Sequence, residues 1–156
     1  MGLLEVTKEF EKIGYQDKII ILKEKTATVL EAAEALHVDP DMIAKTLTFK
    51  TEESCLLIVV AGMRKIDNAK FKQTFKRKAG MLTPDEALEY TGHAVGGICP
   101  FGLKNTLPVY LDISLKDHVT VYPACGNAHS AIALSTSELE KLSHFIKWVD
   151  VTKKDQ

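Results

Sequence analysis

Apolar residues recur at helical spacing in several short segments of the chain. Val6, Phe10 and Ile13 follow one another at intervals of four and three residues, which predicts a helix that ends before Gly14. Other helix starts are marked by polar residues that can cap a first turn, and three of them have the capping-box spacing. Helices are therefore expected after Thr28, Asp39, Asp67, Thr83 and Ser135.

Strand patterns account for most of the remaining apolar residues. Residues 45–50 alternate with a period of two, which places Leu47 and Phe49 on one face and Thr46 and Thr48 on the other. Residues 55–61 form a continuous apolar run typical of a central strand that is covered on both faces. Further strands are expected at 19–22, 94–98, 109–112, 119–122, 130–134 and 145–149.

This order of elements predicts an α+β fold, that is, a mixed α/β arrangement. We expect a curved, barrel-like mixed sheet of about seven strands with the helices packed outside it. No repeat, Pro/Ser linker or block of charge divides the 156 residues, so residues 1–156 are expected to form a single domain.

Composition and charge exclude several classes of function. Twenty Lys and Arg against 21 Asp and Glu give a net charge of −1, so any attraction to nucleic acid must be local. The apolar runs are far shorter than the roughly 20 residues of a membrane span, and the N-terminus lacks the pattern of a secretory signal. We therefore expect a cytoplasmic protein with no membrane partner.

The three cysteines stand at spacings that suit neither a disulfide framework nor paired zinc ligands. Reduced thiols and no metal are expected. Cys99 or Cys125 with His129 could form a thiolate pair, but nothing in their spacing favours such a pair over small buried apolar cysteines. Walker loops, dinucleotide fingerprints, Gly-x-Ser-x-Gly elbows and His-Glu-x-x-His helices do not occur in the sequence.

Two glycine-containing loops, 96–102 and 123–129, interrupt or join the predicted strands. Glycines permit close approach of the backbone, so such loops can direct N–H groups at an oxyanion or a phosphate. The alternative is that these glycines only allow tight turns.

Lys45 and His129 are candidate polar groups near these loops. A lysine at the entrance of a strand is usually a solvated residue, but together with two glycine loops it suits an anionic substrate. His129 is either structural or able to orient a substrate and donate a hydrogen bond.

Residues 64–78 contain seven basic side chains and one acidic side chain. Such a concentration fits either a solvated helix face or a footprint for a phosphate backbone. The candidates for phosphate contacts are Arg64, Lys65, Lys70, Lys72 and Lys76.

Four segments carry a resemblance to a known family. They are Lys45-Thr46-Leu47, Val60-Ala61-Gly62, the loop 95–102 and the later loop that contains Gly126. Together, in order and over about residues 19–149, they resemble the YbaK/EbsC-like family. Its members are freestanding aminoacyl-tRNA deacylases related to the editing domain of bacterial prolyl-tRNA synthetase.

The resemblance implies hydrolysis of the ester that joins a wrong amino acid to tRNA, without a metal or cofactor. It implies that Lys45 meets the tRNA 3′ end and that His129 matches a histidine of the members that act on alanyl-tRNA. The expected catalytic set is Lys45, Gly96, Gly97 and His129. The expected substrate-binding set is Thr28, Thr46, Pro100, Gly102, Gly126 and Asn127, and the basic residues named above would bind tRNA.

Two departures from the family pattern concern the substrate. Cys99 stands where Ser is frequent, and Thr46 stands where some alanine-editing members have Asn. An aminoacyl ester is already activated, so oriented water or ribose hydroxyl and backbone oxyanion donors are sufficient for its hydrolysis. A small pocket would also suit an editing sieve.

The expected function is therefore trans-editing of tRNA that carries Ala, Ser or Cys, with proline tRNA as the body and prolyl-tRNA synthetase as a further partner, and with no DNA partner. A non-catalytic module that binds an amino acid or tRNA is the alternative. A cysteine-dependent hydrolase of small esters or thioesters is a third possibility.

Overall fold

A computed structural model describes residues 2–154. Its helices are α1 (Leu3–Glu11), α2 (Val29–Leu36), α3 (Asn68–Phe75), α4 (Pro84–Thr91) and α5 (Thr136–Ser143), with short 3₁₀ turns η1 (Gln16–Lys18), η2 (Pro40–Met42) and η3 (Ile113–Asp117). Its strands are β1 (Ile20–Ile21), β2 (Ile43–Lys50), β3 (Cys55–Ala61), β4 (Arg64–Ile66), β5 (Val109–Asp112), β6 (Thr120–Pro123), β7 (Ser130–Ala131), β8 (Leu134–Ser135), β9 (Lys147–Val149) and β10 (Thr152–Lys154). None of the helices within residues 2–154 is long and apolar enough to cross a membrane.

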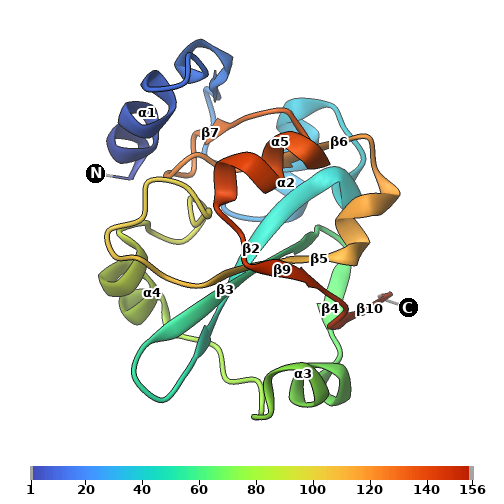
Figure 1. Ribbon diagram of the computed structural model, residues 1–156. Coiled ribbons are helices and arrows are strands. Elements are labelled where there is room, and N and C mark those ends of the chain that lie inside the picture. The colour runs from blue at the N-terminus through green and yellow to red at the C-terminus, as the bar shows by residue number, and fades with distance from the viewer. Residues whose placement is uncertain (1, 155–156) are drawn as a thin grey trace.

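The main sheet has six strands in the order β8-β6-β2-β3-β5-β9 and curls into a half-barrel (Figure 1). The central pair, β2 and β3, is antiparallel, whereas β2–β6, β3–β5 and β5–β9 are parallel. The small pairs β1–β7 and β4–β10 lie outside this sheet. The α+β class and the curved mixed sheet are thus confirmed, with six strands in the sheet where about seven were expected.

Most of the predicted helix starts are confirmed by their caps. Thr28, Thr83 and Ser135 each accept a hydrogen bond from the backbone N–H three residues later, and the glutamate there accepts one from the backbone N–H of the cap residue. The Asp67 carboxylate accepts hydrogen bonds from the first N–H groups of α3. The segment after Asp39 forms only the 3₁₀ turn η2.

Two of the predicted strands were wrong. Residues 94–98 form an irregular loop, because Gly96 has a φ of 89° and the Gly97 N–H turns back to the Ala94 carbonyl. The predicted strand 130–134 is divided into β7, which pairs with β1, and β8, which pairs with β6. In both segments the chain changes direction where one continuous strand was expected.

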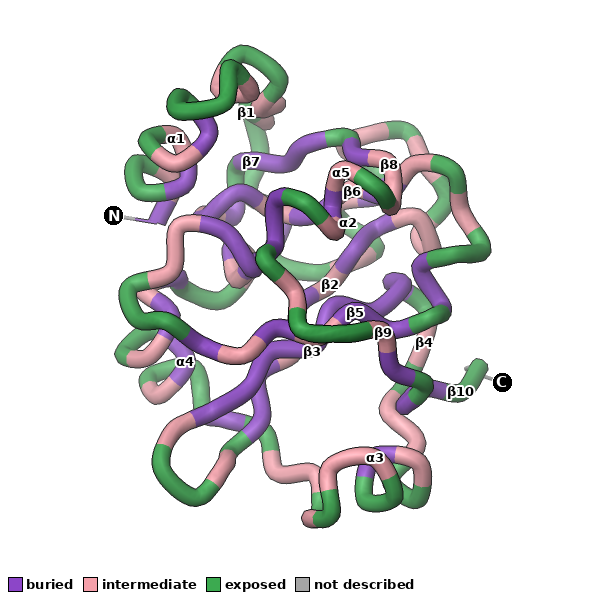
Figure 2. The backbone as a smooth tube through the Cα atoms, viewed as in Figure 1, coloured by how far each residue is buried: buried purple, intermediate pink, exposed green. Residues whose placement is uncertain are grey.

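Strands β2 and β3 separate two apolar clusters. Every residue of β3 is buried, as the purple tube in the centre of Figure 2 shows. On one face, Phe49 and Leu47 of β2 pack with Phe71 of α3. On the other face, Ala44 of β2 belongs to the larger cluster, which also holds Phe10 of α1. The predicted alternation of β2 is confirmed, and its threonines lie on the face away from α3.

Candidate active site

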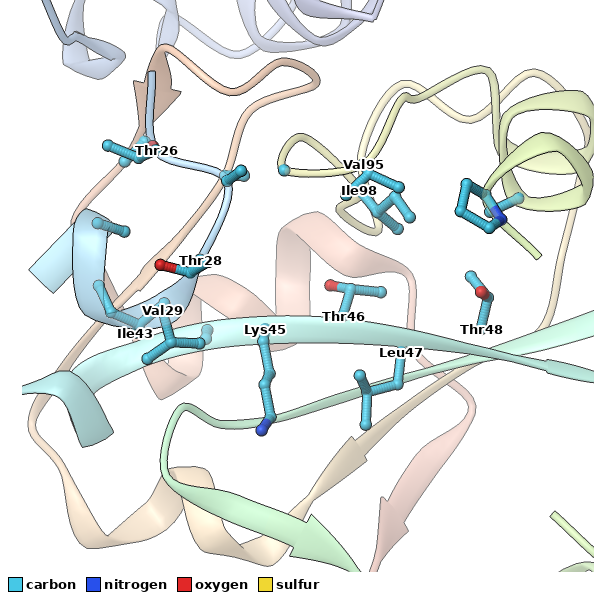
Figure 3. A pocket seen from close by; sticks show the side chains of 18 of the residues that line it. Thr26, Thr28, Val29, Ile43, Lys45, Thr46, Leu47, Thr48, Val95 and Ile98 are labelled. Atoms are coloured by element: carbon cyan, nitrogen blue, oxygen red, sulfur yellow. The ribbon is translucent and has the colours of Figure 1, made fainter. Parts of the chain in front are cut away.

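A pocket of about 370 Å³ lies between β2, the start of α2, the loop 95–98 and the start of α4. Its walls are mainly threonine and aliphatic side chains, some of which Figure 3 shows, including Thr28, Thr46, Thr48, Val95 and Ile98. Lys45 is the one charged residue among those that line it within the described part of the chain. The pocket is therefore small and nearly uncharged inside.

Thr46 lies at the floor of this pocket. Its side chain points from β2 toward the loop that carries Val95 and Ile98 (Figure 3). The residue is only 8% exposed, and its Oγ1 has no hydrogen-bond partner among residues 2–154. Thr26, higher in the same pocket, instead donates its hydroxyl proton to the Ala128 carbonyl at 2.9 Å.

The two glycine loops lie against each other. A Cβ at Gly97 would overlap the backbone of Gly126 and Asn127, and a Cβ at Gly96 would lie 2.9 Å from the Ala128 methyl group. The Gly126 N–H donates to the Gly97 carbonyl at 3.1 Å. Gly97 and Gly126 therefore serve first to bring the loops into contact.

Fewer backbone N–H groups are available to bind an oxyanion than the sequence suggested. The Gly97 N–H already donates to the Ala94 carbonyl at 2.9 Å. The N–H groups of Gly96 and Ile98 have no hydrogen-bond acceptor within the described residues, and both residues line the pocket. The Gly96 N–H is thus still available as a donor, whereas the Gly97 N–H is already occupied.

Pro100 and Gly102 lie beyond the pocket, where the loop meets α1. The Gly102 N–H donates to the Glu9 carboxylate at 3.2 Å, and Gly102 has a φ of 56°. Phe101 packs on Phe10 of α1, with ring centroids 5.1 Å apart. Phe101 and Gly102 thus attach the loop to the N-terminal helix, and neither Pro100 nor Gly102 is among the residues that line the pocket.

Lys45 does not share a face with the threonines. Its side chain leaves β2 on the same side as Leu47, opposite Thr46 (Figure 3). Its Nζ donates to the Arg64 carbonyl at 2.7 Å. The lysine therefore lines the pocket only through its place in β2, whereas its ammonium group lies on the opposite face of the strand.

Asn127 and His129 belong to the turn that follows Gly126. His129 is exposed and is not among the residues that line the pocket. Its backbone N–H donates to the Asn127 Oδ1 at 3.0 Å, and its carbonyl accepts from the Leu22 N–H. Asn127 thus shapes the turn, and the His129 ring faces solvent next to the site.

Within residues 2–154, at least three of the basic residues in 64–78 have acidic partners. Arg64 pairs with Asp117 at 2.8 Å. Lys70 pairs with Asp150 at 3.0 Å and also donates to the Thr152 carbonyl. Arg77 lies 4.0 Å from Glu52. Lys65, Lys72 and Lys76 are exposed. Because Arg64, Lys70 and Arg77 have acidic partners, the charge that this segment offers to phosphates is smaller than its count of basic residues suggests.

The cysteines are buried, which argues against the thiolate alternative. Burial raises the pKa of Cys125 to about 12 and that of Cys99 well above its usual value. Cys99 lies 3.6 Å from His93 Nε2, but burial lowers the pKa of His93, whose Nε2 also lies 2.7 Å from the Phe101 carbonyl. A buried neutral imidazole next to a protonated thiol gives no activated nucleophile.

Several lining residues were missing from the sequence prediction. Thr26, Thr48, Val95 and Ile98 line the pocket, but none was among the predicted site residues. Thr48 could have been found, because it shares the β2 face of Thr46 in the alternation already recognised. No cluster of three or more His, Cys, Asp or Glu suited to a metal occurs within residues 2–154.

Comparison with known proteins agrees with this architecture. The family model of the aminoacyl-tRNA editing domain matches residues 23–142. The uncharacterised protein YwhH of Bacillus subtilis is 47% identical over 154 residues, which cover 98% of each chain.

Two further relatives carry functional descriptions of their own. EbsC of Enterococcus faecalis, described as a candidate Cys-tRNA(Pro)/Cys-tRNA(Cys) deacylase, is 24% identical and covers 94% of this chain and 90% of its own. A crystal structure described as a candidate trans-editing enzyme for prolyl-tRNA synthetase superposes with a TM-score of 0.86 at 29% identity, over 99% of this chain and 98% of that one. The YbaK/EbsC-like resemblance is confirmed, and the chain belongs to the aminoacyl-tRNA editing domain family.

Proposed function

We propose that this chain is a trans-editing deacylase that hydrolyses the ester between a small amino acid and proline tRNA. In this proposal residues 1–156 act as one editing domain in the cytoplasm and correct products of prolyl-tRNA synthetase. The observation that carries it is the pocket of about 370 Å³, which has threonine and aliphatic walls beside two packed glycine loops.

The size and chemistry of the pocket support a small side chain. A synthetase pocket rejects a smaller or near-isosteric amino acid by only about 10- to 200-fold, so a second site of restricted size is needed to remove errors. Among the described lining residues there is no carboxylate or imidazole that could act as a general base. The proposed reaction therefore depends on orientation and on backbone donors, each worth about 10²–10³ in rate.

The N–H groups of Gly96 and Ile98 are the proposed oxyanion donors. Water, oriented by the free ribose hydroxyl, adds to the ester carbonyl carbon. The bond from that carbon to the esterified ribose oxygen then breaks, the ribose oxygen takes up a proton from the water, and the free amino acid is released. Both donors come from one loop that is fixed by its contact with Gly126. Fixed donors need no reorganisation as the oxyanion develops, which is the condition for strong stabilisation.

The tRNA end is proposed to contact Lys45 on the outer face of β2, next to the pocket. An ammonium group on a four-carbon stem can exchange the Arg64 carbonyl for a phosphate oxygen without a change in the strand. His129, exposed at the adjoining turn, is proposed to meet the terminal nucleotide rather than the amino acid. Lys65, Lys72 and Lys76 are proposed to contact phosphates farther along the tRNA.

A non-catalytic binding module is the second candidate function. The observation that favours it is that the N–H groups of Gly97 and Gly126 are already donated within the protein. Under this alternative the pocket binds an amino acid or a tRNA end but provides too few donors to stabilise an oxyanion.

The test is a deacylation panel on proline tRNA charged with Ala, Ser, Cys or Pro. We expect release from at least one of the three mischarged species and protection of Pro-tRNA. Binding without release from any species would favour the non-catalytic module. Equal hydrolysis of Pro-tRNA would contradict the role in editing.

A further inference from the structure

Thr46 carries a buried hydroxyl for which residues 2–154 of the free protein supply no partner. Leaving such a group unpaired costs about 1–3 kcal/mol, so its presence calls for a reason. Valine has nearly the same shape, suits a strand and would avoid this cost. Thr26 in the same pocket is paired with the Ala128 carbonyl, so the pocket does not leave every hydroxyl unpaired.

The surroundings of Thr46 restrict what its partner can be. The residue points toward the 95–98 loop at the floor of the pocket, and the neighbouring loop side chains Val95 and Ile98 are aliphatic (Figure 3). Among the described lining residues there is no acidic side chain that could accompany an ammonium group to this depth. A charged group would lose its hydration there for one neutral hydrogen bond, which is unfavourable.

We propose that Thr46 is a specificity-determining residue that selects aminoacyl esters whose side chain carries a hydroxyl. The inference rests on the proposed function. The ester carbonyl meets the Gly96 and Ile98 N–H groups of the loop toward which Thr46 points, so the serine hydroxyl of the same amino acid comes within reach of Thr46 Oγ1, while the ammonium group points away from it. Val95 is 49% exposed, so this loop side chain can move to admit that contact without a change in the core.

The expected order of substrates follows from how well each amino-acid side chain forms hydrogen bonds. A serine hydroxyl donates and accepts hydrogen bonds well, a cysteine thiol does so weakly, and an alanine methyl group does neither. Alanine would leave the Thr46 hydroxyl unpaired in the complex as in the free protein. We therefore expect kcat/KM to fall in the order Ser, Cys, Ala, with a ratio of about tenfold between Ser and Ala, as one net hydrogen bond provides.

The experiment compares Ser- and Ala-charged proline tRNA in the wild type, Thr46→Val and Thr46→Ser. Thr46→Val is expected to reduce the Ser-to-Ala ratio of kcat/KM about tenfold, mainly through slower release of Ser. Thr46→Ser retains the hydroxyl and is expected to retain the ratio. An unchanged ratio in Thr46→Val, or a wild type that prefers Ala, would overturn the inference.

Thermal unfolding supplies a readout that does not depend on activity. Thr46→Val removes an unpaired buried hydroxyl, so its melting temperature is expected to equal or exceed that of the wild type. Thr26→Val is the matched control, because it removes a paired hydroxyl from the same pocket and is expected to melt at a lower temperature. A destabilised Thr46→Val would show that the hydroxyl has a partner in the free protein and would contradict the inference.

The outcomes also separate this inference from the proposed function. If the wild type releases neither Ser nor Ala from tRNA while Cys-tRNA is also stable, deacylation itself is refuted. If the wild type releases Ser and Ala equally and Thr46→Val does the same, editing stands and only the role of Thr46 fails.

Discussion

Replacing Gly97 by alanine tests the contact between the two glycine loops. The added Cβ would overlap the backbone of Gly126 and Asn127, which cannot move aside as a flexible side chain would. The loops must separate, and the hydrogen bond from the Gly126 N–H to the Gly97 carbonyl lengthens or breaks. The substitution therefore acts on the fold as well as on the site.

The size of the effect follows from two costs and one gain. Overpacking costs about 1–3 kcal/mol, and breaking a backbone hydrogen bond costs about 1 kcal/mol. Alanine also lowers the conformational entropy of the unfolded chain, which stabilises the folded protein by about 0.4–1 kcal/mol. The net destabilisation is about 1–3 kcal/mol, which for a chain of this length lowers the melting temperature by about 3–10 °C.

Gly80→Ala is the matched control. A Cβ at Gly80 meets nothing within 4 Å, and Gly80 is not among the glycines with positive φ. We expect its melting temperature and kcat to equal those of the wild type. Gly97→Ala is expected to lose about 10²-fold in kcat at temperatures where it stays folded, because the Gly96 and Ile98 donors shift with the loop. A Gly97→Ala protein with wild-type melting temperature and kcat would refute the loop contact.

Three further results are expected. Lys45→Ala should lower kcat/KM at least about tenfold, whereas Lys45→Arg retains the charge; unchanged kinetics in folded Lys45→Ala would remove this residue from the site. The double variant Lys72→Ala/Lys76→Ala should reduce the slope of log affinity for tRNA against log salt by roughly 0.7–0.9 for each phosphate that the protein no longer neutralises. Lys70→Ala, whose ammonium is already paired, should leave that slope unchanged, and an unchanged slope in the double variant would assign tRNA to another surface. Burial lowers the pKa of His93 from 6.5, so below this pH the unfolded chain binds a proton that the folded protein does not, and stability falls with falling pH. Between about pH 7.5 and 5.5 the melting temperature of His93→Gln should therefore drop less than that of the wild type. An equal drop in both proteins would contradict this.

The helix starts and central strands could be predicted because local chemistry specifies them. A threonine and a glutamate three residues apart satisfy the same backbone groups wherever the helix packs, as Thr28 and Thr83 do. Strands β4 and β10 could not be predicted, because they are three-residue, largely polar segments that are paired only through the tertiary fold. The strand predicted at residues 94–98 was wrong because Val95 and its apolar neighbours have the composition of a strand, whereas the two glycines of this segment allow the backbone to turn.

The candidate site was predictable in part. The two glycine loops could be recognised because closely spaced glycines mark them, whereas Thr46, which lines the pocket, was named through the family resemblance. The face of Lys45 could also have been found, because Lys45 has the same parity in β2 as Leu47 and Phe49. The pairing of Lys70 with Asp150 joins residues 80 positions apart, which no local pattern reveals.

The attachment of the glycine loop to α1 links the pocket to a part of the chain outside the family-matched range 23–142. A helix of nine residues is unstable alone and persists only while it is packed, so α1 can undock as a local unfolding unit. When it does, Phe101 and Gly102 lose their support and the loop above the pocket is released. Undocking and substrate binding then oppose each other thermodynamically, so a bound aminoacyl end should slow hydrogen exchange in α1 without touching it.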